Sequence, residues 1–460
     1  MPPSCAQMQT TWTIPFAAGH SAFAHRPGVT SGASLVDGQP HSTRDTVQRM
    51  ITLAELVPED TFIAPRLLEE MQPGSPFVGQ QAEALSGALL AVCGSLPILA
   101  HEAASTAPLL DAIAASGLSP PTAVDRFDSR DGYVARVCER MAQGGRAWFT
   151  CPVPLGLFPD EPIVVPPSLI ADLNLRSAID RLVPPENRTK RRVIEGRADV
   201  AQALAALRPG LVVKDARLPS SSGGTGVWVL RRKRHVTRAR TGLAGADRIV
   251  IEARVPYTAN FCVQCTCAGK NEVAFLGSSM QRTRASGIYL GNRFDPAAQP
   301  SSETCALAMT IAAAAAQLGY RGIAGFDILE REDGPPVAID LNFRPNASTP
   351  FLMAFGALGA ARGFDMADLI FATSDTPSRV LLARLWPLIH EGWLVVLGLF
   401  DPQVASMPNG PTNMRLMVMG RDLNEIQRHR KTLRRAGLAL ADERLSPVQR
   451  IARRLRRFMP

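Results

Sequence analysis

Apolar residues in the first third of the chain occur as short continuous runs, separated by stretches with a helical period. Three of these runs, 61–64, 96–100 and 162–166, have the length and composition of buried strands. Between them, residues 109–115 repeat their apolar positions as a helix does, and Gly117, which favours a helix end, follows. Strands that alternate with helices predict an open α/β domain over this part of the chain.

The rest of the chain contains more predicted strands than predicted helices. In addition to a hairpin near residue 333, the predicted strands are 211–214, 227–230, 248–252, 261–267, 273–276, 393–400 and 414–419. The predicted helices are 168–182, 302–318, a pair over 350–375, and two basic helices over 422–436 and 446–458. Residues 1–45 are rich in Pro, Ser, Gly and Thr without a sustained period, which predicts an irregular or disordered segment.

The hairpin carries the clearest candidate chemistry. Two apolar runs flank the turn sequence Glu-Asp-Gly-Pro at 332–335, and a symmetric hairpin places Asp327 opposite Asp340. Asn342, two residues after Asp340, points to the same face. Facing like charges destabilise a sheet unless a cation lies between them, and two carboxylates with an amide oxygen are ligands typical of Mg²⁺. A solvated hairpin face with incidental acids is the alternative.

A second candidate is a polar, glycine-rich loop over 220–226, which follows the predicted strand that contains Lys214. Glycines let the backbone approach phosphates, and a lysine on the preceding strand can neutralise their charge. The sequence is not a Walker P-loop, and a flexible surface loop is the alternative. Further on, an apolar strand ends at Glu252 and Val255 before a proline, where its backbone could contact the edge of an adenine base.

The order and spacing of these pieces resemble the ATP-grasp superfamily over residues 167–355. The segment 338–350 is most similar to the peptide ligases of the pheganomycin type, and 166–176 resembles their entry helix. The resemblance implies a fold that is α/β and α+β, with an N-terminal open α/β pre-ATP-grasp domain followed by an ATP-grasp fold of two α+β subdomains. The implied divisions are an irregular segment (1–45), the pre-ATP-grasp domain (46–166), the ATP-grasp domain (167–375) and a small C-terminal segment with basic helices (376–460).

The resemblance also implies roles for individual residues. Lys214 is expected at the α- and β-phosphates, Glu252 and Val255 at the adenine edge, and Arg344 at the transferring phosphoryl group. The residues expected to close over the triphosphate are Ser221, Ser222, Gly223, Gly224, Thr225 and Gly226. The residues expected to bind the metal are Asp327, Asp340 and Asn342.

Three positions depart from the pattern of the family. Arg176 stands where a lysine is usual, which keeps the charge but changes its geometry. Asp340 stands where the longer glutamate is common, and Asn260 takes the place of an acidic ribose contact. Between the adenine-binding strand and the hairpin lie Arg282, Arg284 and Arg293, any of which could bind a substrate carboxylate through two hydrogen bonds. We expect one of the three, with Arg284 as the catalytic candidate, to be functional rather than a solvated surface arginine.

Charge is distributed unevenly over the 460 residues, a length that allows two or three domains. The net charge is +9, and residues 421–460 hold +8 of it, with twelve Lys or Arg against four Asp or Glu. This does not favour a nucleic-acid surface spread over the whole protein. Val448, Ile451 and Leu455 recur at helical spacing in this tail. The pattern favours a helix docked by its apolar stripe, and binding to RNA or an anionic membrane is the alternative.

Cysteine usage and the apolar runs exclude several other classes. Eight cysteines are too few for a disulfide framework in a chain of this length, and Cys262, Cys265 and Cys267 suit a core strand better than a zinc site. The N-terminus lacks the charged segment of a secretory signal. The longest apolar run, 84–100, is too short and too interrupted to span a bilayer, and predicts a buried helix followed by a strand. We therefore expect a cytoplasmic protein.

Together, the residues and the resemblance predict an ATP-dependent ligase that joins a carboxylate, amino-acid-like or peptide-like, to an amine through an acyl phosphate. The expected cofactors are ATP and Mg²⁺, with Mn²⁺ as an alternative metal. The expected partners are small-molecule carboxylate and amine or peptide substrates, not nucleic acid, and the sequence leaves the oligomeric state open. The alternative function is a catalytically degenerate ATP-binding regulatory protein whose basic tail binds RNA or membrane.

Overall fold

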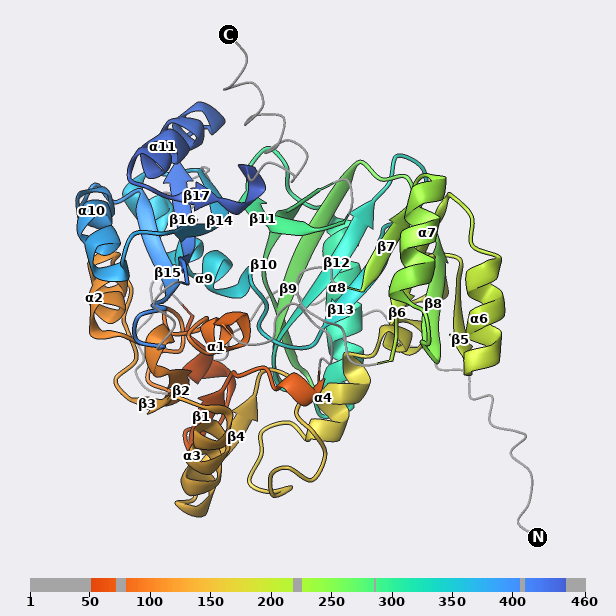
Figure 1. Cartoon of the computed structure of the whole chain (residues 1–460), viewed down its shortest axis with the longest axis horizontal. Helices are drawn as coiled ribbons and strands as arrows, with labels where there is room; N and C mark the ends of the chain where they lie inside the picture. Colours follow the sequence, from red (N-terminus) through yellow and green to blue (C-terminus); the bar gives the residue numbers. More distant parts are fainter. Residues whose placement is uncertain (1–50, 72–79, 218–225, 285–286, 406–409, 444–460) are drawn as a thin grey trace, which may run out of the picture. The chain divides into compact units, whose positions relative to one another are not determined.

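The N-terminal part of the protein is built around a four-stranded parallel sheet. The computed structural model describes residues 51–71, 80–217, 226–284, 287–405 and 410–443. The first sheet has the order β3-β2-β1-β4, with β1 (Thr61–Ala64), β2 (Ile98–His101), β3 (Val124–Phe127) and β4 (Arg146–Phe149). Its helices are α1 (Gln80–Ser86), α2 (Ala107–Ala115) and α3 (Arg130–Ala142) (Figure 1). The open α/β prediction for this region is confirmed.

One strand predicted in this region is wrong. Residues 162–166 form no extended strand, and only Ile163 pairs with the sheet, beside Ala147 of β4. The physical reason is the proline at each end of the run, Pro162 and Pro166. A proline has no N–H group to donate to a strand ladder, so pairing stops after one residue.

The predicted helix over 168–182 is divided into two. It consists of α4 (Pro167–Leu173) and α5 (Ile179–Leu182), joined through a short 3₁₀ turn, Arg176–Ala178. Asn174 ends α4: its side-chain amide donates to the carbonyl oxygen of Ile170 at 2.8 Å. Its side-chain oxygen meanwhile accepts from the backbone N–H of Phe343 at 3.1 Å. The division therefore serves a contact with a distant segment, which helical periodicity cannot reveal.

A second sheet of four antiparallel strands follows, in the order β5-β8-β6-β7. Its strands are β5 (Arg191–Glu195), β6 (Leu211–Asp215), β7 (Val227–Leu230) and β8 (Arg248–Ala253), and its helices are α6 (Arg197–Ala205) and α7 (Lys233–Gly242). Val200 and Leu204 of α6 and Val236 of α7 bury their side chains with Val213 and Ile249 of the sheet. Both helices therefore dock on the sheet through apolar residues, and Figure 1 shows α6 and α7 next to its strands.

The third sheet is the largest and runs in the order β13-β12-β9-β10-β11-β14-β16-β15, with β17 paired to β14. Its strands are β9 (Ala259–Gly269), β10 (Glu272–Thr283), β11 (Tyr289–Phe294), β12 (Gly322–Glu330), β13 (Val337–Asn342), β14 (Met366–Ser374), β15 (Leu394–Phe400), β16 (Thr412–Gly420) and β17 (Ala439–Leu440). The accompanying helices are α8 (Ser302–Gln317), α9 (Thr349–Leu358), α10 (Ser378–His390) and α11 (Leu423–Arg435). The remaining 3₁₀ turns are Leu53–Leu56, Glu69–Met71, Glu102–Ala104, Pro185–Asn187, Ala360–Arg362 and Ala441–Glu443.

The second half of the helical pair predicted over 350–375 is a strand. Helix α9 ends at Leu358, and β14 pairs on one side with β11 and on the other with β16. A short, mainly apolar run buried on both faces has no period that separates a strand from a buried helix. Because β14, β15 and β16 continue the same sheet as β9, the division at residue 375 stays a prediction.

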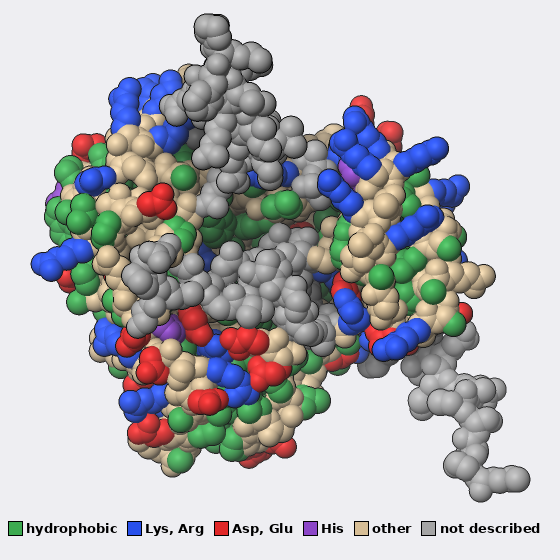
Figure 2. All heavy atoms as spheres, in the orientation of Figure 1, with side chains coloured by type: hydrophobic (Ala, Val, Ile, Leu, Met, Phe, Trp, Pro, Cys, Tyr) green, Lys and Arg blue, Asp and Glu red, His purple; other side chains and the backbone are tan. Residues whose placement is uncertain are grey.

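Other predictions concern the tail and the cysteines. The basic helix predicted over 422–436 is confirmed as α11, which buries Ile426 and Leu433, and Figure 2 shows Lys and Arg side chains gathered over α11 and α7. The second basic helix, 446–458, and the segment 1–45 lie outside the described residues. The prediction that Cys262, Cys265 and Cys267 are buried in a core strand is confirmed in β9. In the described part of the chain, no helix is long and apolar enough to cross a membrane.

Candidate functional site

The acidic hairpin pairs its two aspartates as predicted, but the pairs nearest the turn differ by one residue from those of a symmetric hairpin. In the β12–β13 ladder, Asp327 pairs with Asp340 and Gly325 pairs with Asn342, and the register shifts by one residue immediately after Asp327. The protein atoms around Asp327 displace water from its carboxyl group, and the charge of Asp340 adds to their effect, so that the pKa of Asp327 rises to about 7. Gln281 opposes this shift, because it donates from Nε2 to Oδ1 of Asp327 at 2.6 Å.

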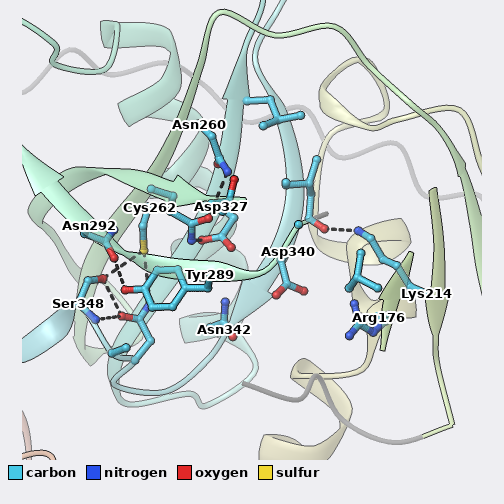
Figure 3. A pocket seen from close by; sticks show the side chains of 18 of the residues that line it. Arg176, Lys214, Asn260, Cys262, Tyr289, Asn292, Asp327, Asp340, Asn342 and Ser348 are labelled. Atoms are coloured by element: carbon cyan, nitrogen blue, oxygen red, sulfur yellow. Dashed lines mark hydrogen bonds between the residues drawn. The ribbon is translucent and has the colours of Figure 1, made fainter. Parts of the chain in front are cut away.

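A buried lysine connects this hairpin to the second sheet. Nζ of Lys214, on β6, lies 2.9 Å from Oε2 of Glu252, on β8, and donates to the backbone oxygen of Ile339 at 2.6 Å. Ile339 directly precedes Asp340 on β13, so the lysine lies beside the acidic pair (Figure 3). Lys214 and Glu252 are 5% and 3% exposed. The structure therefore brings Lys214, Glu252 and the acidic hairpin together, although they lie far apart in the sequence.

Two arginines lie close to the same hairpin. Arg344 follows β13, is buried, and donates from Nη1 to Oδ1 of Asn174 at 2.7 Å. Because Asn174 ends α4, the entry helix helps to hold this guanidinium in place. Arg176, two residues further on, is buried as well.

These residues surround one cavity of about 300 Å³. The predicted site residues that line it are Arg176, Lys214, Glu252, Val255, Asn260, Arg284, Asp327, Asp340, Asn342 and Arg344. Ser221, Ser222, Gly223, Gly224 and Thr225 lie outside the described residues. Gly226 is described, and its carbonyl oxygen accepts a hydrogen bond from the backbone of Asp215 at 2.8 Å, but it is not part of the cavity lining.

Of the three candidate substrate arginines, Arg284 lines the cavity, whereas Arg282 and Arg293 belong to an ion cluster. Asp368 of β14 is fully buried, and it lies 3.1 Å from Nη1 of Arg282 and 2.7 Å from Nε of Arg293. Arg430 of α11 joins the same carboxylate at 3.2 Å. The cluster therefore ties strands β10, β11 and β14 to α11, and engages the two arginines in a structural contact.

Sequence reasoning missed several residues that line the cavity. They are polar residues on β10, β11 and the turn after β13, one arginine on β16, and apolar residues of the N-terminal region: Gln281, Tyr289, Asn292, Asn346, Ser348, Arg415, Pro65, Leu85, Ala88 and Leu89. Tyr289 donates through its hydroxyl to Oδ1 of Asn292, whose amide donates to Ser279 at 2.9 Å (Figure 3). One signal was available in the sequence, because Arg415 interrupts a strand that is otherwise largely apolar.

Comparison with known proteins places two segments of the chain in one enzyme family. Residues 189–342 match the family model "L-aspartate--L-methionine ligase, ATP grasp", and residues 52–171 match the model of the L-aspartate--L-methionine ligase N-terminal domain. The two matches together cover more than half of the chain, in the predicted order of an N-terminal domain and an ATP-grasp domain.

Solved structures with a similar arrangement are distant in sequence. N5-carboxyaminoimidazole ribonucleotide synthetase from Thermus thermophilus is 15% identical, with a TM-score of 0.48, over 77% of this chain and 95% of that one. The ADP complex of N5-carboxyaminoimidazole synthetase from Staphylococcus aureus is 9% identical, with a TM-score of 0.49 and the same two coverages, 77% and 95%. Biotin carboxylase from Campylobacter jejuni is 13% identical, with a TM-score of 0.46, over 75% and 86%. On the evidence of the two family models, this chain belongs to the ATP-grasp superfamily and is an ATP-dependent carboxylate–amine ligase.

Proposed function

We propose that the enzyme forms an amide or peptide bond between two amino-acid-like substrates through an acyl phosphate. The observation that carries this proposal is the meeting of the facing pair Asp327 and Asp340 with Lys214 and Arg344 around one cavity. Two acids that could hold a metal stand next to cations that could bind phosphate oxygens. The name of the matching family makes L-aspartate and L-methionine the first pair of substrates to test.

Asp327, Asp340 and Asn342 would hold Mg²⁺, or Mn²⁺ in its place. The donor set fits a hard divalent cation, because it consists of two carboxylates and one amide oxygen. Burial, and then the charge of Asp340, raise the pKa of Asp327, so a cation between the two carboxylates would favour the ionised form of Asp327. A cation bound there would also offset negative charge on the phosphates of ATP.

The remaining residues would divide nucleotide binding among them. Lys214 and Arg176 would contact phosphate oxygens. The backbone from Glu252 to Val255 would contact the adenine edge, and Asn260 would contact the ribose. Because Glu252 is already within 2.9 Å of Lys214, it also orients the lysine.

In the proposed reaction, a carboxylate oxygen of the acid attacks the γ-phosphorus of ATP, and ADP leaves. The amine nitrogen then attacks the acyl carbon, the C–O bond to phosphate breaks, and the nitrogen loses a proton as inorganic phosphate departs. Arg344, with Arg284 as a second candidate, would stabilise the negative charge that develops on the transferred group. The cavity would contribute mainly by orienting the reactants and excluding water, since acyl phosphates hydrolyse readily.

The test is ADP release that depends on both an acid and an amine. Purified enzyme is given ATP, Mg²⁺, L-aspartate and L-methionine, and then N-blocked amino acids crossed with amino acids and short peptides, with the amide product identified by mass. Asp340→Ala and Asn342→Ala should each reduce ADP release by about 100-fold or more, since metal ligation contributes several kcal/mol. Asp333→Asn, in the exposed turn of the same hairpin, is the matched control and should be unaffected.

Unchanged ADP release in Asp340→Ala and Asn342→Ala would refute the metal assignment. ADP release that needs no amine, with no amide product, would refute ligation of two amino-acid-like substrates.

A further inference from the structure

Arg415 lines the cavity and has no carboxylate partner among the residues that the structure describes. Within this part of the chain, its guanidinium makes a single hydrogen bond, a long one of 3.5 Å from Nη1 to the carbonyl oxygen of Ala88, and its buried Nε has none. Loss of water around the guanidinium lowers the pKa of Arg415. Its counterparts Arg282 and Arg293 in the same sheet are each compensated by Asp368.

The surroundings of Arg415 leave this charge facing the cavity. Its guanidinium lies 5.6 Å from the ring centroid of Phe371, its register partner on β14. The ring of Phe371 lies 5.8 Å from that of Tyr289, which also lines the cavity. A desolvated guanidinium with free N–H groups is a strong receptor for a carboxylate, because the hydrogen bonds it forms are charge-assisted.

The wall beside Arg415 is apolar and comes from the N-terminal region. Pro65, Leu85, Ala88 and Leu89 line the cavity, and Ala88 is the residue whose carbonyl oxygen contacts Arg415. Pro65 and Leu89 are buried, whereas Leu85 and Ala88 remain partly exposed. A carboxylate receptor next to an apolar surface fits a small molecule that carries a carboxylate and an apolar side chain.

The position of Arg415 and the apolar wall beside it indicates which of the two substrates they would bind. In Figure 3, Lys214 and Arg176 lie to one side of Asp327 and Asp340, whereas Tyr289, the neighbour of Phe371, lies to the other. In the proposed reaction, the acid brings its reacting carboxylate to the γ-phosphate, which Arg344 and a cation held by Asp327 and Asp340 would bind. The amine must reach the same carbon from the side that the nucleotide does not occupy.

We propose that Arg415 binds the free carboxylate of the amine substrate, and that Pro65, Leu85 and Leu89 contact its apolar side chain. This inference rests on the proposed function and makes the amine substrate an apolar α-amino acid. It also makes Arg415 a specificity-determining residue.

The experiment compares an apolar amino acid with its primary carboxamide as amine substrates of the full-length enzyme, with ATP, Mg²⁺ and the acid held constant. Wild-type enzyme should prefer the free carboxylate by about 10- to 100-fold in kcat/KM, as expected for one charge-assisted contact. Arg415→Met should bring this ratio close to one by raising KM for the amino acid, with KM for ATP unchanged. Arg415→Lys should retain part of the preference. Arg421→Met, at a side chain that is 70% exposed, is the matched control.

A wild-type enzyme without preference for the carboxylate would overturn the inference, and this result needs no variant. A preference that survives in Arg415→Met would overturn it as well. The inference would also be overturned if Arg415→Met lost its discrimination among acids and kept its discrimination among amines. Absence of amide product with every pair of substrates would instead refute the proposed function on which the inference rests. Melting temperature and ATP binding report folding of the variants, and Arg415→Lys carries the test if Arg415→Met does not fold.

Discussion

Lys214 and Glu252 form a buried ion pair, with Nζ 2.9 Å from Oε2, on strands β6 and β8. Lys214→Met leaves the buried carboxylate of Glu252 with Arg191, whose Nε is 3.5 Å away, as its remaining ion-pair partner among the described residues. We expect the free energy of unfolding to fall by about 3–5 kcal/mol, the usual cost of a buried charge that loses its partner. Urea unfolding measures this change.

A matched control for this pair is Arg217→Met. Its partner Asp215 lies 2.6 Å away, but the Arg217 side chain is 43% exposed, so the loss should stay below about 1 kcal/mol. The double variant Lys214→Met/Glu252→Gln should lose less stability than the sum of the single variants. Additive losses would show that the two side chains do not depend on each other.

Asp327 should make the stability of the metal-free protein depend on pH. Its pKa is about 7 in the folded protein and 3.8 for an ordinary aspartate, so folding favours its protonated form. The stability it contributes is complete below pH 3.8 and is lost as the pH rises through about 7. Asp327→Asn should abolish this loss, which thermal unfolding in chelator across pH 4.5–8 measures against wild type.

Divalent metal should reverse the effect of pH. Because a proton and a cation compete for Asp327, the stabilisation by Mg²⁺ should weaken as the pH falls below about 7. An equal shift in melting temperature with Mg²⁺ at pH 5.5 and pH 8 would contradict a role for Asp327 in metal binding.

Gln264 should hold the turn that follows Arg344. This fully buried side chain donates from Nε2 to Asn346 at 3.1 Å and to Ser348 at 2.7 Å, and accepts from Thr349 at 2.8 Å. Gln264→Leu keeps the volume but leaves the buried Ser348 and Thr349 and the partly buried Asn346 each short of a partner. Chemical denaturation should show a loss of about 2–4 kcal/mol, whereas the exposed Gln317→Leu should change stability by less than about 0.5 kcal/mol.

Gly322 should be required for the contact between β12 and the N-terminal sheet. Its φ is +120°, and a Cβ added there would lie 2.6 Å from the indole ring of the buried Trp148. Gly322→Ala should therefore lower the free energy of unfolding by about 2–4 kcal/mol, from backbone strain and overpacking together. Gly144→Ala also has a positive φ, +89°, but nothing within 4 Å, and should cost only about 1 kcal/mol. Equal losses in the two variants would show that Trp148 does not constrain this position.

Leu85 should affect selection among amine substrates. It lines the cavity and is partly exposed, so Leu85→Ala removes apolar contact area while leaving most of the fold undisturbed. KM should rise about 10-fold for an amine substrate with a large apolar side chain, and should stay unchanged for glycine. An equal rise for both substrates would place Leu85 outside the side-chain subsite.

Several features of the site follow from local sequence. The turn signal at 332–335 indicates that the two flanking apolar runs pair as a hairpin, and this pairing brings Asp327 near Asp340. The one-residue register shift beside Asp327, which puts the two acids directly opposite each other, has no signal in the local sequence. The strands that carry Lys214 and Glu252 were also predicted, since a short apolar run bounded by polar residues is a local signal. Local sequence alone therefore indicates approximately where along the chain the candidate nucleotide-binding residues lie.

The amine-binding side of the cavity depended on tertiary structure. Arg415 and Phe371 are register partners on β16 and β14, and the second of these strands was predicted to be helical. Asn174, which ends α4, meets Arg344 from a position 170 residues away. The sequence determined which segments bear charge and which are apolar, because those properties are local. Only the tertiary structure decided which charges are compensated and which face the cavity, because burial and strand pairing arise between residues that are distant along the chain.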